Sequence, residues 1–316
     1  MAQLVKLHDY VSRYETDLTR YPTQFVRLKQ NQWKRMKIQW ETSSNHSMWE
    51  DDAQDIEPVE KNQLAALFRF FSPRKEERVL VEAPLVISEE EADFDFTTTM
   101  TYKPASLNQL RTLYLDQIFH FQIKWASSTL MDKSRVNPVY MRDSLLRTFI
   151  QQLPDSYLLF YNPIIMLQKA TVELDIIIIT PVECMCITVL EEKDLTAFAG
   201  DAGRFWTTKL GDNESKVLNP LLALNRMEKI VSRLFREKDV DFPIKKYLLS
   251  RNGYIDYPIR PFDVEIVDRR SYDEWFSSLR ILSTPLKFTQ FQAAQAILDV
   301  GQTSAISRLL DEEERV

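Results

Sequence analysis

The stretch from residue 172 to residue 193 constrains the fold of this chain more than any other. It reads V-E-L-D-I-I-I-I-T-P-V-E-C-M-C-I-T-V-L-E-E-K. Two apolar runs of strand length, rich in β-branched residues, flank the short turn T-P-V-E, which predicts a buried β-hairpin. One carboxylate, Asp175, interrupts the first run, while Glu191, Glu192 and Lys193 come after the second. Charged groups therefore stand at one end of the predicted hairpin.

The register of the hairpin decides which of these charged groups can meet. A turn centred between residues 181 and 182 pairs Asp175 with Thr188. Because side chains alternate along a strand, Glu191 and Lys193 then point to the opposite face. A β-bulge would shift this register by one residue. Without a bulge, the face of Asp175 carries these residues: Cys184, Cys186, Thr188, Leu190 and Glu192.

Composition narrows the class of protein. The 316 residues are 44% hydrophobic and 27% charged, as in ordinary globular proteins, and are enough for two domains. No apolar run approaches the roughly 18 residues of a membrane-spanning helix, and the N-terminus lacks a signal-peptide pattern. We therefore expect a cytoplasmic protein that does not enter a membrane.

Several common sites find no support in the sequence. The chain has five glycines and neither a P-loop nor a dinucleotide-binding motif. Cys184 and Cys186 stand two apart on one predicted strand, where a disulfide is hard to form, so we expect two buried thiols. The three histidines show no ligand spacing with the cysteines, which argues against a zinc site.

We expect two regions, a mainly helical region over 1–136 and an α/β domain over 137–316. The boundary falls after a polar break at 132–135, just before Asn137-Pro138. The N-terminal region is expected to hold helices over 4–18, 23–41, 62–71 and 106–125, with a strand near 96–102. In the second region, a glycine-containing loop comes after the hairpin. Its other expected elements are strands at 157–161, 164–167, 246–250 and 264–267, and helices at 140–152, 220–236, 271–280, 288–299 and 303–313.

The hairpin and several segments downstream of it resemble the NERD (nuclease-related domain) family of the PD-(D/E)XK superfamily. The pattern E-L-D, apolar strand, T-P turn and apolar strand matches the family core. The Gly200–Trp206 segment, Asn219-Pro220 and residues 242–252 resemble its later motifs. The resemblance covers about residues 138–255. It implies a restriction-endonuclease-like mixed sheet flanked by helices, in a bacterial type of protein.

The resemblance also implies catalytic positions, and several of them are changed. The family uses an aspartate on one strand and Glu-x-Lys on the next to bind Mg²⁺ and activate water. Asp175 matches the aspartate, but the Glu and Lys positions fall on Thr188 and Leu190. The family glutamate on the helix near 140–152 has Asp143 as its nearest candidate. A glutamine after Asn-Pro is replaced by Ala223.

Asp175 therefore has two interpretations. Its carboxylate is a catalytic metal ligand if a bulge brings Glu191 or Glu192, with Lys193, beside it. Otherwise it is an inherited carboxylate satisfied by an arginine, such as Arg142 or Arg204, or by backbone amides.

A second candidate site lies near the N-terminus. Residues 20–40 contain six basic residues, no acidic residue and interleaved aromatics. Such a mixture can track a phosphate backbone while stacking bases. It is also typical of an amphipathic helix with a solvated basic face. The candidate nucleic-acid-binding residues are Arg27, Lys29, Trp33, Lys34, Arg35 and Lys37.

These patterns are compatible with three functions. We favour a non-catalytic nuclease-related protein, a pseudoenzyme that needs no cofactor and binds DNA, RNA or a protein partner. The first alternative is an active Mg²⁺-dependent nuclease with Asp175 as a metal ligand. The second alternative is an interaction protein without nucleic-acid contact.

Overall fold

The computed structural model describes residues 1–50, 96–168, 170–192, 195–258, 261–281 and 284–307. The chain divides into two compact units, one formed by residues 1–29 and 112–316 and the other by residues 30–111. These limits differ from the boundary expected between residues 136 and 137. They differ because the first strand of the chain pairs within the sheet of the larger unit.

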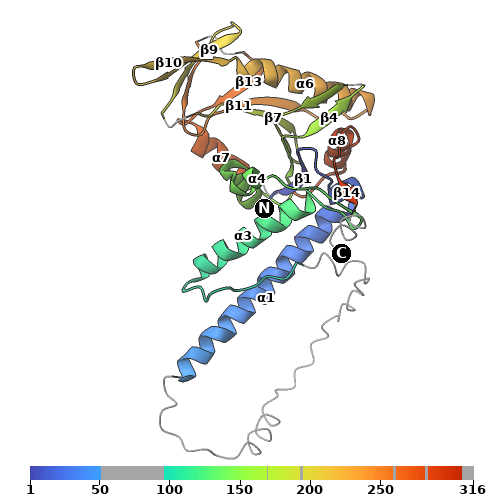
Figure 1. The fold of residues 1–316 in the computed structure, drawn as a ribbon, viewed down its shortest axis with the longest axis vertical. Coiled ribbons are helices and arrows are strands. Elements are labelled where there is room, and N and C mark those ends of the chain that lie inside the picture. The colour runs from blue at the N-terminus through green and yellow to red at the C-terminus, as the bar shows by residue number, and fades with distance from the viewer. Residues whose placement is uncertain (51–95, 169, 193–194, 259–260, 282–283, 308–316) are drawn as a thin grey trace, which may run out of the picture. The chain divides into compact units, whose positions relative to one another are not determined.

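The larger sheet of this unit has six strands in the order β1-β3-β6-β7-β11-β13 (Figure 1). β6 runs antiparallel to β3 and β7, whereas β1 is parallel to β3, and β7, β11 and β13 are parallel to one another. The sheet is thus mixed, as the nuclease-fold expectation requires. The bounds are Gln3–Leu7 (β1), Leu158–Tyr161 (β3), Ile176–Ile179 (β6), Cys184–Val189 (β7), Ile244–Leu249 (β11) and Val264–Val267 (β13).

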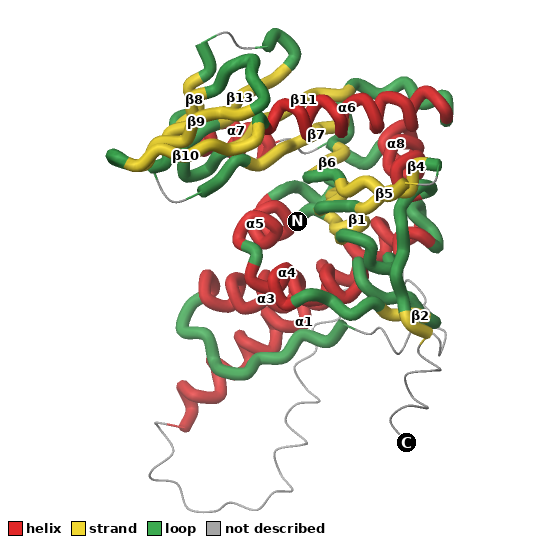
Figure 2. The backbone as a smooth tube through the Cα atoms, turned by 45° about the horizontal axis from the view of Figure 1, so that its top comes forward, coloured by secondary structure: helices red, strands yellow, loops and turns green. Residues whose placement is uncertain are grey.

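Helices cover both faces of the six-stranded sheet. α6 lies along β7 and β11 and also contacts α8 (Figure 2). On the other face, α5 and α7 share a buried core with the sheet, in which Phe149 and Phe276 stack 6.3 Å apart. The helices of the larger unit, in full or in part, are α1 (Arg20–Glu50), α3 (Leu107–Trp125), α4 (Pro138–Arg142), α5 (Ser144–Gln152), α6 (Pro220–Glu237), α7 (Tyr272–Ile281) and α8 (Phe288–Leu298).

A second sheet in the same unit has four strands in the order β10-β9-β8-β12 (Figure 2). Its bounds are Ala197–Ala199 (β8), Phe205–Leu210 (β9), Asn213–Leu218 (β10) and Tyr254–Asp256 (β12). The prediction of a loop after the hairpin is therefore wrong, because most of these residues form strands. A sequence signal existed: Gly211-Asp212 links the two runs, and Gly211 has φ +59, as the first position of a type II′ hairpin turn requires.

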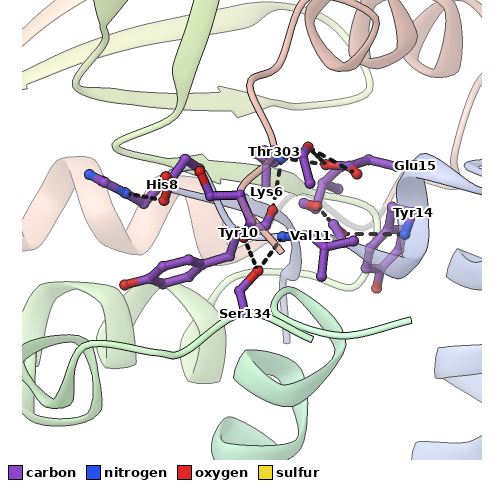
Figure 3. A network of polar contacts seen from close by, with 12 residues as sticks. Lys6, His8, Tyr10, Val11, Tyr14, Glu15, Ser134 and Thr303 are labelled. Atoms are coloured by element: carbon purple, nitrogen blue, oxygen red, sulfur yellow. Dashed lines mark hydrogen bonds and ion pairs between the residues drawn. The ribbon is translucent and has the colours of Figure 1, made fainter. Parts of the chain in front are cut away.

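The helix expected over residues 4–18 is also wrong. These residues form β1 and the 3-10 turn η1 (Arg13–Glu15). All five residues of β1 are buried, so the strand gives no alternating pattern, and its apolar spacing imitates a helix. Lys6 within it is 1% exposed, and its ammonium donates to Tyr10 O, Thr303 Oγ1 and Glu15 (Figure 3). Burial lowers the pKa of Lys6, although the Glu15 carboxylate opposes this shift.

The remaining expectations divide between confirmed and corrected elements. The strands near 157–161, 164–167, 246–250 and 264–267 are confirmed, as are the helices that became α1, α3, α6, α7 and α8. The helix over 140–152 is broken at Asp143 into α4 and α5. The strand expected near 96–102 is wrong, because these residues form no regular element. Residues 303–307 end in a short strand, β14 (Ile306–Ser307), paired with β2 (Asp132–Lys133), and the helix expected at 62–71 lies outside the described residues.

The smaller unit is described over residues 30–50 and 96–111. Its core includes Met36, Phe96 and Leu110, and Trp40 Nε1 donates to Pro104 O at 2.7 Å. Among the described helices of the chain, none combines the length and apolar character needed to cross a bilayer.

Candidate functional site

Asp175 lies at one edge of the six-stranded sheet, beside the ends of several other strands. It comes directly before β6, and the carboxyl ends of β1, β3, β7, β11 and β13 reach the same edge, because β6 runs against its neighbours. The β6–β7 pairing matches Ile176 with Ile187, so the hairpin is in the register expected without a bulge. The Thr188 hydroxyl donates to Asp175 Oδ2 at 2.5 Å. Asp175 therefore faces a hydroxyl at the position where the hairpin resemblance led us to expect a glutamate in the family.

Glu191 points to the opposite face of the sheet. Arg251, just after β11, binds it through two nitrogens: Nε to Oε1 at 2.6 Å and NH2 to Oε2 at 2.7 Å. The Arg251 amide also donates to Glu191 Oε1 at 3.0 Å, and its guanidinium reaches Ser144 Oγ in α5 at 3.4 Å. This hydrogen bonding to Glu191 raises the pKa of Arg251 further above its usual range. The Glu191 carboxylate is fully engaged in a structural ion pair.

Asp143 is used as a helix cap. Its Oδ1 accepts the amides of Leu145 and Leu146 at 2.9 and 3.0 Å, which satisfies two free donors at the start of α5. Its Oδ2 accepts the Tyr161 hydroxyl at 2.6 Å. Burial, together with this bond to Asp143, raises the pKa of Tyr161. Burial also raises the pKa of the neighbouring Tyr140 to about 12, so both phenols stay protonated at neutral pH.

Glu192 and Lys193 are the two remaining charged candidates for the site. The side chain of Glu192 is exposed, and its backbone carbonyl accepts the Asn252 side-chain amide at 2.8 Å. Lys193 lies outside the described residues. Of the arginines considered as partners of Asp175, Arg142 is exposed, and Arg204 lies 5.7 Å from the Phe205 ring centre. The hydrogen bond that was expected from an arginine or from backbone amides comes from the Thr188 hydroxyl.

The described residues around Asp175 offer few of the ligands that a magnesium ion of the nuclease type needs. Such an ion needs several carboxylate or carbonyl oxygens that converge on one point. The strand position opposite Asp175 is Thr188, a weak neutral ligand, and Leu190 offers no side-chain oxygen. Glu192, the next position expected on this face, has an exposed side chain. Within the described part of the chain, no three His, Cys, Asp or Glu side chains converge as metal ligands.

Two motif positions shared with the nuclease-related family have structural roles here. Asn219 caps α6 through Leu221 N at 3.0 Å, and its amide donates to Gly203 O at 2.8 Å. Gly200 lies so close to two aromatic rings that an added Cβ would come within 2.3 Å of Tyr257 and 2.9 Å of Trp206. These motifs therefore fix the loop between β8 and β9 against the start of α6.

The basic residues predicted near the N-terminus lie on α1. Arg27 is exposed. Lys34 and Arg35 are exposed as well, and they are neighbours along the part of α1 that belongs to the smaller unit. Lys29 is instead bound to the Asp155 carboxylate, and Lys37 lies 3.7 Å from Glu41. Trp33 is half-buried. The exposed part of the predicted surface is thus Arg27, Lys34 and Arg35.

Sequence reasoning missed Arg251 as the partner of Glu191. The two residues are 60 positions apart, and they meet because β7 and β11 pair in parallel with Val189 opposite Leu249. No short-range spacing signals such a contact. Sequence reasoning also missed the hydrogen bond between His8 Nδ1 and Asp9 Oδ1, which are 2.6 Å apart just after β1. It was missed because residues 4–18 were expected to form a helix.

A six-stranded mixed sheet flanked by helices, with an aspartate at the start of the hairpin, defines a restriction-endonuclease-like α/β protein. Residues 142–253, about a third of the chain, match the family of the nuclease-related domain. The chain therefore contains a nuclease-related domain, as the hairpin resemblance predicted.

One curated relative shares a short segment with the chain. The RNA 2′,3′-cyclic phosphodiesterase of Geobacillus stearothermophilus is 58% identical over 41 residues. The match covers 13% of this chain and 13% of that protein. No solved structure matches the chain.

Proposed function

We propose that this protein is a nuclease-related module that has lost metal-dependent hydrolysis and binds nucleic acid. The observation that carries the first part is the pairing of Asp175 with the Thr188 hydroxyl, at the position of the second family carboxylate. The Glu191 carboxylate supports the same conclusion, because Arg251 holds it on the other face of the sheet. We place this role in the cytoplasm, as the sequence predicts.

The exposed basic pair of α1, which is Lys34 and Arg35, is the proposed contact with nucleic acid. Both side chains lie in a segment, from residue 20 to residue 40, that carries no acidic residue. Lysine and arginine at exposed helix positions neutralise phosphates and release counterions. This chemistry supports binding to the backbone of either DNA or RNA, without base recognition.

Salt-dependent binding tests this proposal. We expect the full chain to bind labelled single- and double-stranded DNA and RNA with an affinity that falls steeply with salt in fluorescence anisotropy. The Lys34→Ala/Arg35→Ala variant should bind more weakly, with a log–log salt slope smaller by about 1.5, as expected for two lost phosphate contacts.

The matched control is Arg226→Ala/Lys229→Ala, which removes the same charge from exposed positions of α6. It should bind like the unchanged chain. Equal losses in both variants, or binding that does not respond to salt, would contradict the α1 surface. An absence of binding to every nucleic acid would favour the alternative of a protein-interaction module.

A further inference from the structure

β10 is the outer strand of the four-stranded sheet. Among the described strands its one neighbour is β9, so its other edge is unpaired within that part of the chain. Five of its six residues are exposed, and Val217 is half-buried. It reads N-E-S-K-V-L, with Glu214 and Lys216 on either side of Ser215. An uncovered edge strand is a template for pairing with another strand.

The backbone groups that point outward can be identified. Asn219 N donates to Arg204 O at 2.9 Å, directly beyond the pair Leu218–Phe205. Hydrogen-bonded and non-hydrogen-bonded pairs alternate in an antiparallel ladder, so Val217 and Ser215 bond toward β9. The N–H and C=O groups of Glu214 and Lys216 therefore point to the free edge.

We propose that β10 pairs antiparallel with β10 of a second copy of this chain, about a two-fold axis at Ser215. In this register Glu214 lies opposite Lys216 of the second copy, and Lys216 lies opposite its Glu214. Both pairs join residues whose backbone N–H and C=O groups point to the free edge. The same register therefore satisfies the backbone hydrogen bonds and pairs opposite charges. This proposal is independent of the proposed nucleic-acid binding.

Neighbouring charges favour this register over the others. The Lys209 ammonium lies 2.7 Å from the Glu214 carboxylate on the same face of the sheet. In the dimer, charges along that row would alternate in sign from Lys209 to Glu214 to Lys216 of the second copy. Registers that place Glu214 opposite Glu214, or Lys216 opposite Lys216, join like charges, which is unfavourable. Edge lysines usually discourage pairing, but here the strand is complementary to itself.

The dimer should be weak and reversible. A pairing of two six-residue strands is small beside the roughly 1,000 Å² of stable interfaces. We therefore expect self-association that rises with protein concentration and falls with salt.

Sedimentation velocity of the full chain over a concentration series tests the dimer. Lys216→Glu and Glu214→Lys each create like-charge pairs, and each should raise the dimer dissociation constant about tenfold. Mixing the two single variants restores opposite charges across the interface, so the mixture should associate more than either variant alone. The double variant Glu214→Lys/Lys216→Glu also restores opposite charges across the interface, so it should dimerise more tightly than either single variant.

Lys229→Glu on α6 is the matched control, and it should leave dimerisation unchanged. Thermal unfolding followed by circular dichroism checks that all variants are folded. If Glu214→Lys does not fold, the comparison of Lys216→Glu with Lys229→Glu still tests the proposal. A monomer at every concentration would overturn the proposal. So would dimerisation of Lys216→Glu equal to that of the unchanged chain, or a mixture that associates no more than its components.

Discussion

At the residue scale, both carboxylates of the apparent catalytic signature are satisfied by groups of the chain itself. Asp175 accepts the Thr188 hydroxyl, and Glu191 accepts a two-nitrogen contact from Arg251. They lie on opposite faces of one sheet, since the β6–β7 ladder has no bulge. Two carboxylates on opposite faces are poorly placed to share one metal ion.

Removing the partner of Glu191 should therefore destabilise the protein. Arg251→Met leaves a carboxylate that is only 20% exposed without its guanidinium, so we expect a loss of about 1–3 kcal/mol in the free energy of unfolding. Arg233→Met is the matched control, because Arg233 and Glu237 are also 2.6 Å apart but are 55% and 52% exposed. The control should lose less than about 1 kcal/mol. Equal losses in urea denaturation would contradict the structural role of the Glu191–Arg251 pair.

The sequence could predict part of this site. Side-chain alternation was enough to pair Asp175 with Thr188 and to turn Glu191 away, because both result from a turn of known length. Arg251 could not be predicted in the same way, because a parallel pairing between distant strands has no local signal. The roles of Glu192 and Lys193 as site residues stay predictions.

At the scale of elements, Asp268 joins the two sheets of the larger unit. It comes directly after β13 of the six-stranded sheet, is 4% exposed, and accepts the Ile255 amide of β12 at 3.1 Å. Arg270 Nε donates to the same carboxylate at 2.9 Å. Burial alone would raise the pKa of Asp268, but the hydrogen bonds from Arg270 and the Ile255 amide lower it below 3.8.

This shift predicts a pH dependence. Because the pKa of Asp268 is lower in the folded than in the unfolded state, its contribution is complete above pH 3.8 and is lost as the pH falls below that value. Asp268→Asn should reduce the free energy of unfolding by about 1–3 kcal/mol at pH 7. The difference from the unchanged chain should shrink on acidification below pH 3.8.

Asp256→Asn is the control, because Asp256 is 68% exposed and lies 3.5 Å from the same Arg270. Its effect should be small at every pH. Chemical denaturation between pH 2.5 and pH 7, a range chosen to bracket the carboxyl pKa of roughly 3.9, measures both variants. A constant difference between Asp268→Asn and the unchanged chain over that range would contradict the assignment.

Elements with a strong local signal were predictable. The T-P turn fixed the hairpin, and Asn219-Pro220 placed the start of α6, because a cap and a proline at the first turn are local devices. β1 could not be predicted, because a strand buried on both faces shows no alternation of apolar and polar residues. Its pairing partner, β3, is some 150 residues away along the chain. The second sheet was missed although the Gly211-Asp212 turn was visible in the sequence.

At the scale of the whole chain, the class of protein could be predicted from the sequence. The limits of the compact units along the chain could not. The nuclease-related match over residues 142–253 agrees with the region expected from the motifs. Yet the sheet that carries this domain also uses residues 3–7, so a boundary drawn from composition separates strands that pair. Sequence patterns indicate local structure, whereas this sheet pairs strands that lie far apart along the chain.

The central proposal is that this chain, which contains a nuclease-related domain, has lost metal-dependent hydrolysis. The most direct test incubates the full chain and Asp175→Ala with labelled single- and double-stranded DNA and RNA, in Mg²⁺, in Mn²⁺ and in a chelator. We predict that the unchanged chain releases no more product than Asp175→Ala under any of these conditions. Cleavage by the unchanged chain that requires the metal and disappears in Asp175→Ala would contradict the claim and establish an active nuclease.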